Sequence, residues 1–133
     1  MSKKIAKKII AVAMIVSCLV GMAYSSNAAN INVSFGGNKT PGYSSSTFNP
    51  HSTNATAQIT SVGFIGVPPE VWPYNKSIWL SLYRNGAVQT SWVKHTSKYT
   101  VKSISGISPQ NANYNVGAKT DNSTGATINV NIV

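Results

Sequence analysis

The sequence predicts an all-β fold: a small antiparallel β-sandwich of about seven strands that follows an N-terminal signal peptide. Three observations lead to this prediction. The first segment resembles a leader, apolar residues alternate with polar ones over most of the remainder, and that remainder is rich in Asn, Ser, Thr and Gly. Alternation with a period of two is typical of strands that bury one face. The spacing of these strands suits an immunoglobulin-like or a jelly-roll-like sandwich.

The first 28 residues have the layout of a secretory signal peptide. Lysines at positions 3, 4, 7 and 8 precede an uncharged, mostly apolar run over residues 9–20, and Ser26 and Ala28 supply the small residues of a cleavage site. The run is shorter than the ~20 residues that span a bilayer. Cys18 leaves a lipoprotein as a minority alternative. We therefore expect residues 29–133 to form one secreted or extracellular domain, with a leader of bacterial style.

Composition limits what this domain can be. Without the leader, seven lysine and arginine residues face two acidic ones, which leaves a net charge of +5, and no cysteine remains to form a disulfide. Its stability must therefore come from an ordinary apolar core, which a chain of ~100 residues can bury.

The first half of the domain contains two clear strands. Ile31, Val33 and Phe35 alternate with polar residues, and a second run covers residues 56–65 until Pro68 and Pro69 end it. Residues 38–54, between these strands, predict either a long loop or a weak edge strand at 43–48. Residues 68–75 predict a structured turn.

A β-hairpin over residues 78–93 is the clearest local signal. Asn85-Gly86 is the favoured pair for a two-residue type I′ turn. This turn predicts that Arg84 faces Ala87 and that Tyr83 faces Val88. Continued without interruption, the same register pairs Leu80 with Ser91 and Trp79 with Trp92. Ile78, Leu80, Leu82 and Val93 then share one apolar face, while the aromatic side chains share the other.

Three further strands complete the prediction. They lie at residues 98–104, at 114–116 and at 127–133, separated by turns that contain Pro109 and Gly125.

The residues that most catalytic and metal sites require are scarce. The domain contains only Glu70 and Asp121 as acids, and His51 and His95 as candidate bases. Neither paired carboxylates nor a hydrolase triad follows from this set, and the spacing fits no zinc site. We expect no enzyme, no metal and no cofactor, and we take both histidines to be exposed residues of loops or edges.

Five residues are the candidate ligand-binding set: Trp79, Tyr83, Trp92, Lys94 and Lys98. If the aromatic face of the hairpin meets solvent, its rings can stack on sugar rings while the lysines attract anionic groups. The alternative is that these aromatic residues fill the core or pack beneath the 72–74 segment. The sequence does not decide which face is buried.

Export, a lone β-domain and this aromatic face favour a secreted, non-catalytic binding or cell-surface-associated protein. Its expected partner is a cell-wall polysaccharide or another anionic surface. A nucleic acid is not expected, because the domain has one arginine and no recognition motif. A cationic antimicrobial or membrane-active protein is the first alternative. An inhibitor or a self-assembling matrix component is the second, and the oligomeric state stays open.

Overall fold

The computed structural model describes residues 28–133, so the predicted leader lies outside the described residues. The described chain is all-β and forms nine strands. They are β1 (Ala29–Phe35), β2 (Gly42–Phe48), β3 (Asn54–Phe64), β4 (Ile78–Arg84), β5 (Ala87–Val88), β6 (Val93–His95), β7 (Val101–Ser105), β8 (Tyr114–Thr120) and β9 (Ala126–Ile132). Over this range, the structure contains no helix long and apolar enough to cross a membrane.

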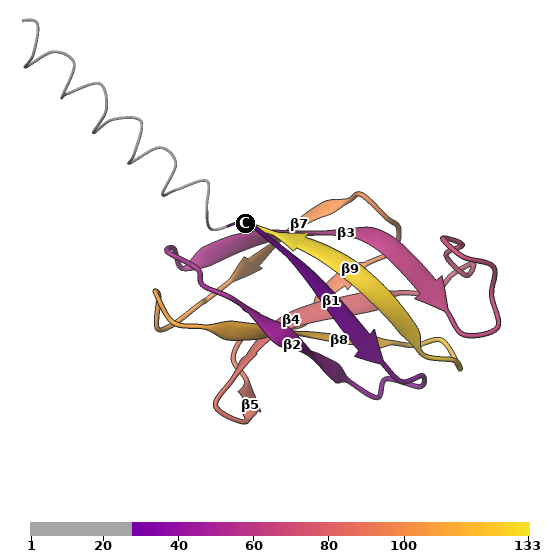
Figure 1. Ribbon diagram of the computed structural model, residues 1–133, viewed down its shortest axis with the longest axis horizontal. Coiled ribbons are helices and arrows are strands. Elements are labelled where there is room, and N and C mark those ends of the chain that lie inside the picture. Colours follow the sequence, from indigo (N-terminus) through magenta and orange to yellow (C-terminus); the bar gives the residue numbers. More distant parts are fainter. Residues whose placement is uncertain (1–27) are drawn as a thin grey trace, which may run out of the picture.

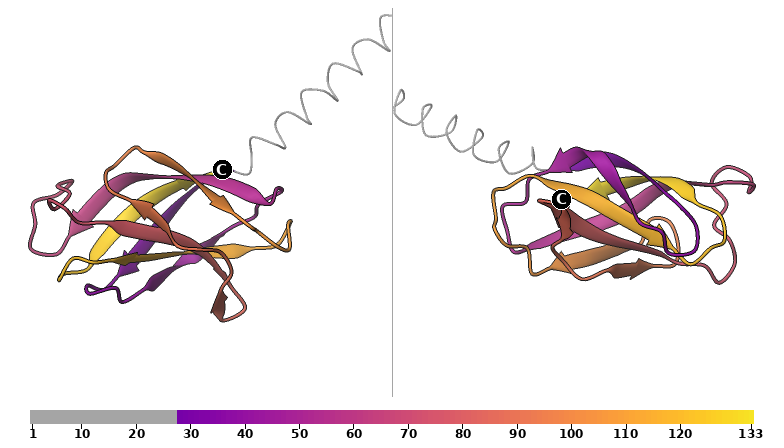
Figure 2. Two further views of the ribbon diagram at one scale, coloured as in Figure 1. Left: turned by 180° about the vertical axis from the view of Figure 1, so that it is seen from behind. Right: turned by 90° about the horizontal axis from the view of Figure 1, so that it is seen from below.

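The strands form two antiparallel sheets that lie one above the other (Figure 1). Sheet A has the order β1-β9-β3-β7, and sheet B has the order β2-β8-β4-β5, with β6 also paired to β4. The two further views in Figure 2 show the same two layers from behind and from below. Ala29 pairs with Ile132, so the C-terminal strand lies beside the first strand. The two layers form a sandwich-like arrangement around one core.

The prediction of about seven strands is wrong by two. Residues 38–54 contain a true strand, because β2 pairs with β8 at the edge of sheet B, although the register shifts between Tyr43 and Thr47. Residues 43–48 are rich in serine and show only weak alternation of apolar and polar side chains. The sequence pattern could therefore not distinguish an edge strand from a loop. The second arm of the hairpin is also split into β5 and β6.

Alternating apolar residues from both sheets make the core. Ile31 and Val33 of β1 and Ile128 and Val130 of β9 are almost fully buried, as the alternation predicts. Ile107 follows β7 and is also fully buried, although it lies in a segment predicted as a turn. The outer faces of β1 and β9 carry Asn, Ser and Thr side chains in cross-strand pairs.

Sheet B presents its aliphatic face to the core. Ile78, Leu80 and Leu82 of β4 have no exposed surface, so the apolar face predicted for the first hairpin arm is the face that the fold buries. Because side chains alternate along a strand, the intervening residues of β4 project from the outer face of sheet B. The fold therefore directs the aromatic residues of the hairpin away from the core.

Candidate functional site

The candidate site is the outer face of sheet B, where four aromatic and three lysine side chains gather. We call this set the aromatic–lysine face. Its members are Tyr43, Trp79, Tyr83, Trp92, Lys39, Lys94 and Lys119. Four of the seven were predicted from the sequence, namely Trp79, Tyr83, Trp92 and Lys94. The other three, Tyr43, Lys39 and Lys119, come from distant parts of the chain, and no sequence pattern links them to the hairpin.

The hairpin register is confirmed next to the turn and wrong further from it. Tyr83 pairs with Val88 as predicted, but Trp79 pairs with Lys94 rather than with Trp92, and Leu80 pairs with Val93 rather than with Ser91. The second arm has therefore slipped by two residues. A slip of two residues keeps the faces, since side chains alternate with a period of two.

Thr90 is the physical reason for this slip. Its buried hydroxyl accepts a hydrogen bond of 2.9 Å from the backbone N–H of Leu82, and the N–H of Gln89 donates to the Leu82 carbonyl at 2.8 Å. The side chain of Thr90 thus replaces a backbone carbonyl in the ladder. The chain bulges around it before β6 resumes pairing at Val93.

Two lysines flank Trp79 across the sheet. Lys119 of β8 and Lys94 of β6 are its direct partners on the two neighbouring strands. The Lys94 Nζ lies 5.9 Å from the centroid of the Trp79 ring, and the Lys119 Nζ lies 4.3 Å from the centroid of Trp92. Both distances fall within cation–π range, which is about 6 Å. Trp79 and Trp92 are half-buried.

The turn between β1 and β2 adds a third lysine. Lys39 places its Nζ 5.7 Å from the centroid of Trp79. Asn38 and Lys39 both adopt left-handed backbone angles, with φ of 52° and 61°. This conformation is unfavourable for Lys by about 1–2 kcal/mol. The backbone N–H groups of both residues donate to the carbonyls of Asn122 and Thr120, at 2.7 and 2.6 Å, and so hold the turn beside sheet B.

A stacked tyrosine pair occupies the other end of the face. The rings of Tyr43 and Tyr83 lie 4.0 Å apart between centroids and are inclined by 26°. Gly117 of β8 makes room for them, because a Cβ atom there would lie only 3.0 Å from the Tyr43 ring and 2.9 Å from the Ser81 Oγ. The Ser81 hydroxyl is fully buried and has no hydrogen-bond partner.

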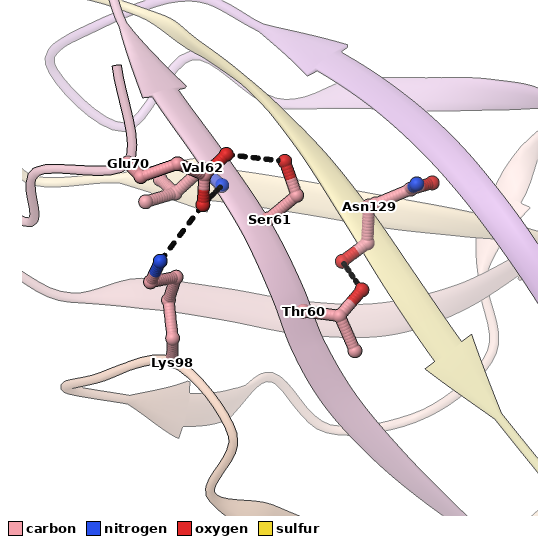
Figure 3. Close-up of polar contacts among 6 residues, drawn as sticks. All are labelled: Thr60, Ser61, Val62, Glu70, Lys98 and Asn129. Atoms are coloured by element: carbon pink, nitrogen blue, oxygen red, sulfur yellow. Dashed lines mark hydrogen bonds and ion pairs between the residues drawn. The ribbon is translucent and has the colours of Figure 1, made fainter. Parts of the chain in front are cut away.

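Lys98 is not part of this face, which corrects its place in the predicted set. Its Nζ forms an ion pair of 2.8 Å with Glu70, whose carboxylate also accepts a hydrogen bond from Ser61 of β3 at 2.7 Å (Figure 3). These hydrogen bonds lower the pKa of Glu70, and the same ion pair raises the pKa of Lys98. Lys98 is thus bound to the loop that follows β3, on the side of sheet A.

The histidine prediction is correct for His51 and wrong for His95. His51 is exposed and bonds to Asn111. His95 ends β6 and is fully buried, with its ring nitrogens 3.3 Å from the carbonyl oxygens of Val93 and Ala57. Burial lowers the pKa of His95, and the positive charge of Lys102 acts in the same direction. His95 is therefore neutral at pH 7 and belongs to the core.

Asp121, the second acidic residue of the domain, is hydrogen-bonded to the backbone. Its carboxylate accepts a hydrogen bond of 2.8 Å from the N–H of Ser77. Across residues 28–133, no three His, Cys, Asp or Glu side chains come close enough to hold a metal ion. The aromatic–lysine face combines four aromatic rings with three positively charged side chains.

Comparison of the chain with protein-family models, with curated proteins and with solved structures finds no match.

Proposed function

We propose that the protein is exported and acts as a non-catalytic binding protein for a cell-surface glycan, which it holds on the aromatic–lysine face. One observation carries this proposal. Four aromatic rings project from the outer face of sheet B, while Ile78, Leu80 and Leu82 on the inner face supply the core. The aromatic side chains of the hairpin are therefore not needed to fill the space between the sheets.

Rings on a sheet suit glycans for a physical reason. A sugar ring has an apolar face of C–H groups, which loses water favourably when it packs on an aromatic ring. A sheet holds successive rings at fixed spacings, since neighbouring strands lie about 4.8 Å apart. A polymer with repeating sugar units can therefore meet several rings at once.

The proposal extends to the fold and to export. The two packed antiparallel sheets support a small β-sandwich, with the immunoglobulin-like and jelly-roll-like versions as its two alternatives. The lysine-rich, apolar start of the sequence supports export. Mass spectrometry of protein expressed from the full-length sequence and recovered outside the cell should find Ala29 as the first residue. An intact N-terminus would contradict cleavage.

Co-sedimentation with insoluble glycans tests binding directly. Protein expressed from the full-length sequence is mixed with peptidoglycan, with walls that carry teichoic acid, with chitin and with cellulose. Trp79→Ala should weaken binding about tenfold or more, because an aromatic anchor at the centre of a binding surface contributes at least ~1–2 kcal/mol to binding. Tyr74→Ala is the matched control, since Tyr74 is an aromatic residue that is 89% exposed outside the face.

Three results would count against this function. Equal binding by Trp79→Ala and the unchanged protein, with the same circular dichroism, would remove the proposed site. Binding to none of the glycans, together with dye release from anionic liposomes, would favour the membrane-active alternative. A size-exclusion volume that falls at high concentration would favour the self-assembling alternative.

A further inference from the structure

We infer that the aromatic–lysine face selects an anionic glycan over a neutral one, because its lysines cover the tryptophan rings until an anion draws them away. This inference rests on the proposed function and names the substrate class of the same face. It assigns two residues, Lys39 and Lys119, to the binding of charge. The ligand chemistry is a chain of sugar units that carries carboxylate or phosphate groups.

The charge balance of the protein is the first support. Only two acidic residues occur in the chain, and both are engaged elsewhere, Glu70 with Lys98 and Asp121 with the backbone of Ser77. Lys98–Glu70 is the one ion pair found within residues 28–133. Lys39, Lys94 and Lys119 therefore converge on two tryptophan rings without a carboxylate to neutralise them.

The position of Lys119 is the second support. Its Nζ lies 4.3 Å from the centroid of the Trp92 ring, close enough to occupy one face of that ring. A neutral sugar can stack on this face only by displacing the ammonium group and receives no charge compensation for doing so. An anionic sugar attracts the same ammonium group, so that stacking and ion pairing occur together.

The spacing of the lysines favours a polymer over a single sugar. Lys94 and Lys119 lie on the two strands that neighbour β4, and Trp79 lies between them. Their backbones are thus roughly 10 Å apart, which is two strand spacings. Lys39 adds a third positive charge to the face, and its Nζ lies over the Trp79 ring, as that of Lys94 does. A chain that crosses the strands and carries repeated charges can contact these lysines in succession.

Charge removal at Lys119 tests the inference. The protein expressed from the full-length sequence and its Lys119→Gln variant are each titrated with soluble neutral, uronate-containing and phosphodiester-linked glycans. Tryptophan fluorescence measures the binding. We expect the unchanged protein to bind an anionic glycan at least about tenfold more tightly than a neutral one. Lys119→Gln should weaken anionic binding about tenfold and should tighten neutral binding severalfold, because the Trp92 ring is uncovered.

Two control variants separate this effect from net charge and from misfolding. Lys102→Gln removes the same charge from β7 of sheet A, where Lys102 is exposed, and should leave both affinities within about twofold. Lys119→Arg keeps the charge and should restore the preference for anionic glycans. Circular dichroism and the melting temperature of each variant show whether the fold is intact.

Each remaining outcome has a distinct meaning. Equal affinity for neutral and anionic glycans would overturn the inference but leave the proposed function standing. Equal weakening by Lys119→Gln and Lys102→Gln would show that overall charge alone acts and would also overturn it. Binding to sugar-free anionic vesicles as tight as binding to glycans would refute the sugar requirement. No binding of any glycan by any variant would contradict the proposed function itself. The uronate and phosphodiester arms identify which anion is preferred.

Discussion

Thr90→Val should destabilise the domain by removing one hydrogen bond. The substitution keeps the size and branching of the side chain but replaces the hydroxyl that accepts from the Leu82 N–H at 2.9 Å. Both residues are buried, so this N–H would be left without a partner. An unsatisfied buried backbone donor costs about 1–3 kcal/mol. At ~2 kcal/mol, the melting temperature of a domain of this size falls by roughly 10 °C.

Urea and thermal unfolding, followed by circular dichroism, measure this cost. Thr90→Ser is the matched control, because it loses a methyl group but keeps the hydroxyl, and it should be the more stable of the two variants. Hydrogen exchange gives a local readout, since the Leu82 amide should exchange faster in Thr90→Val. If Thr90→Val were as stable as the unchanged protein while Thr90→Ser were destabilised, packing and not the hydrogen bond would hold the bulge. The explanation of the hairpin slip would then fail.

Three further predictions follow from single residues. His95 is buried and neutral in the folded protein, and its pKa is lowered there. Its contribution to stability is fully present above its unfolded pKa of about 6.5 and is lost as pH falls toward its folded pKa. The unfolding free energy should therefore decrease below pH ~6.5, with a slope of up to ~1.4 kcal/mol per pH unit. His95→Gln should remove that slope, and an unchanged slope would assign it to other groups. Gly117→Ala should push the Tyr43 ring out of its stack, which a loss of near-ultraviolet circular dichroism and of glycan affinity would reveal, whereas an unchanged spectrum would contradict the close contact. Glu70→Gln should lower the urea midpoint only slightly, since its ion pair with Lys98 is exposed, and about 1 M salt should erase most of the difference. A large loss that persists in salt would show that the Ser61 and Val62 hydrogen bonds of Glu70 matter more than its charge.

The aromatic–lysine face shows which features neighbouring residues in the sequence can predict. Alternation along β4 placed Ile78, Leu80 and Leu82 on one apolar face, which the structure buries, and the Asn85-Gly86 turn fixed the pairing of Tyr83 with Val88. Both predictions depend only on neighbouring residues and on one short turn. The conformation of such a turn is set by its own two residues, and the turn then sets the register of the adjacent pairs. They were sufficient to predict that Trp79 and Tyr83 share a face.

The hairpin departs from the predicted register where the Thr90 side chain takes part in the hydrogen bonding between the strands. No periodicity reveals that the hydroxyl of Thr90 takes the place of a backbone acceptor, so the slip that pairs Trp79 with Lys94 was not foreseen. Burial of His95 was missed for a related reason. A histidine between polar residues looks exposed in the sequence, but in the structure its ring lies 3.3 Å from the Ala57 carbonyl oxygen of the distant strand β3.

Residue types and near neighbours suffice to predict the all-β class, the strands with strong alternation and the positive charge. The packing of the two sheets reveals which sheet face is buried and which lysines reach the tryptophans. Lys39 approaches Trp79 because backbone hydrogen bonds to Asn122 and Thr120 hold its turn beside sheet B. Lys98 has the same charge, but it forms an ion pair with Glu70, which lies in the loop that follows β3. Pairings between residues so far apart in the chain are set by sheet order and loop closure, which leave no periodic signal in the sequence.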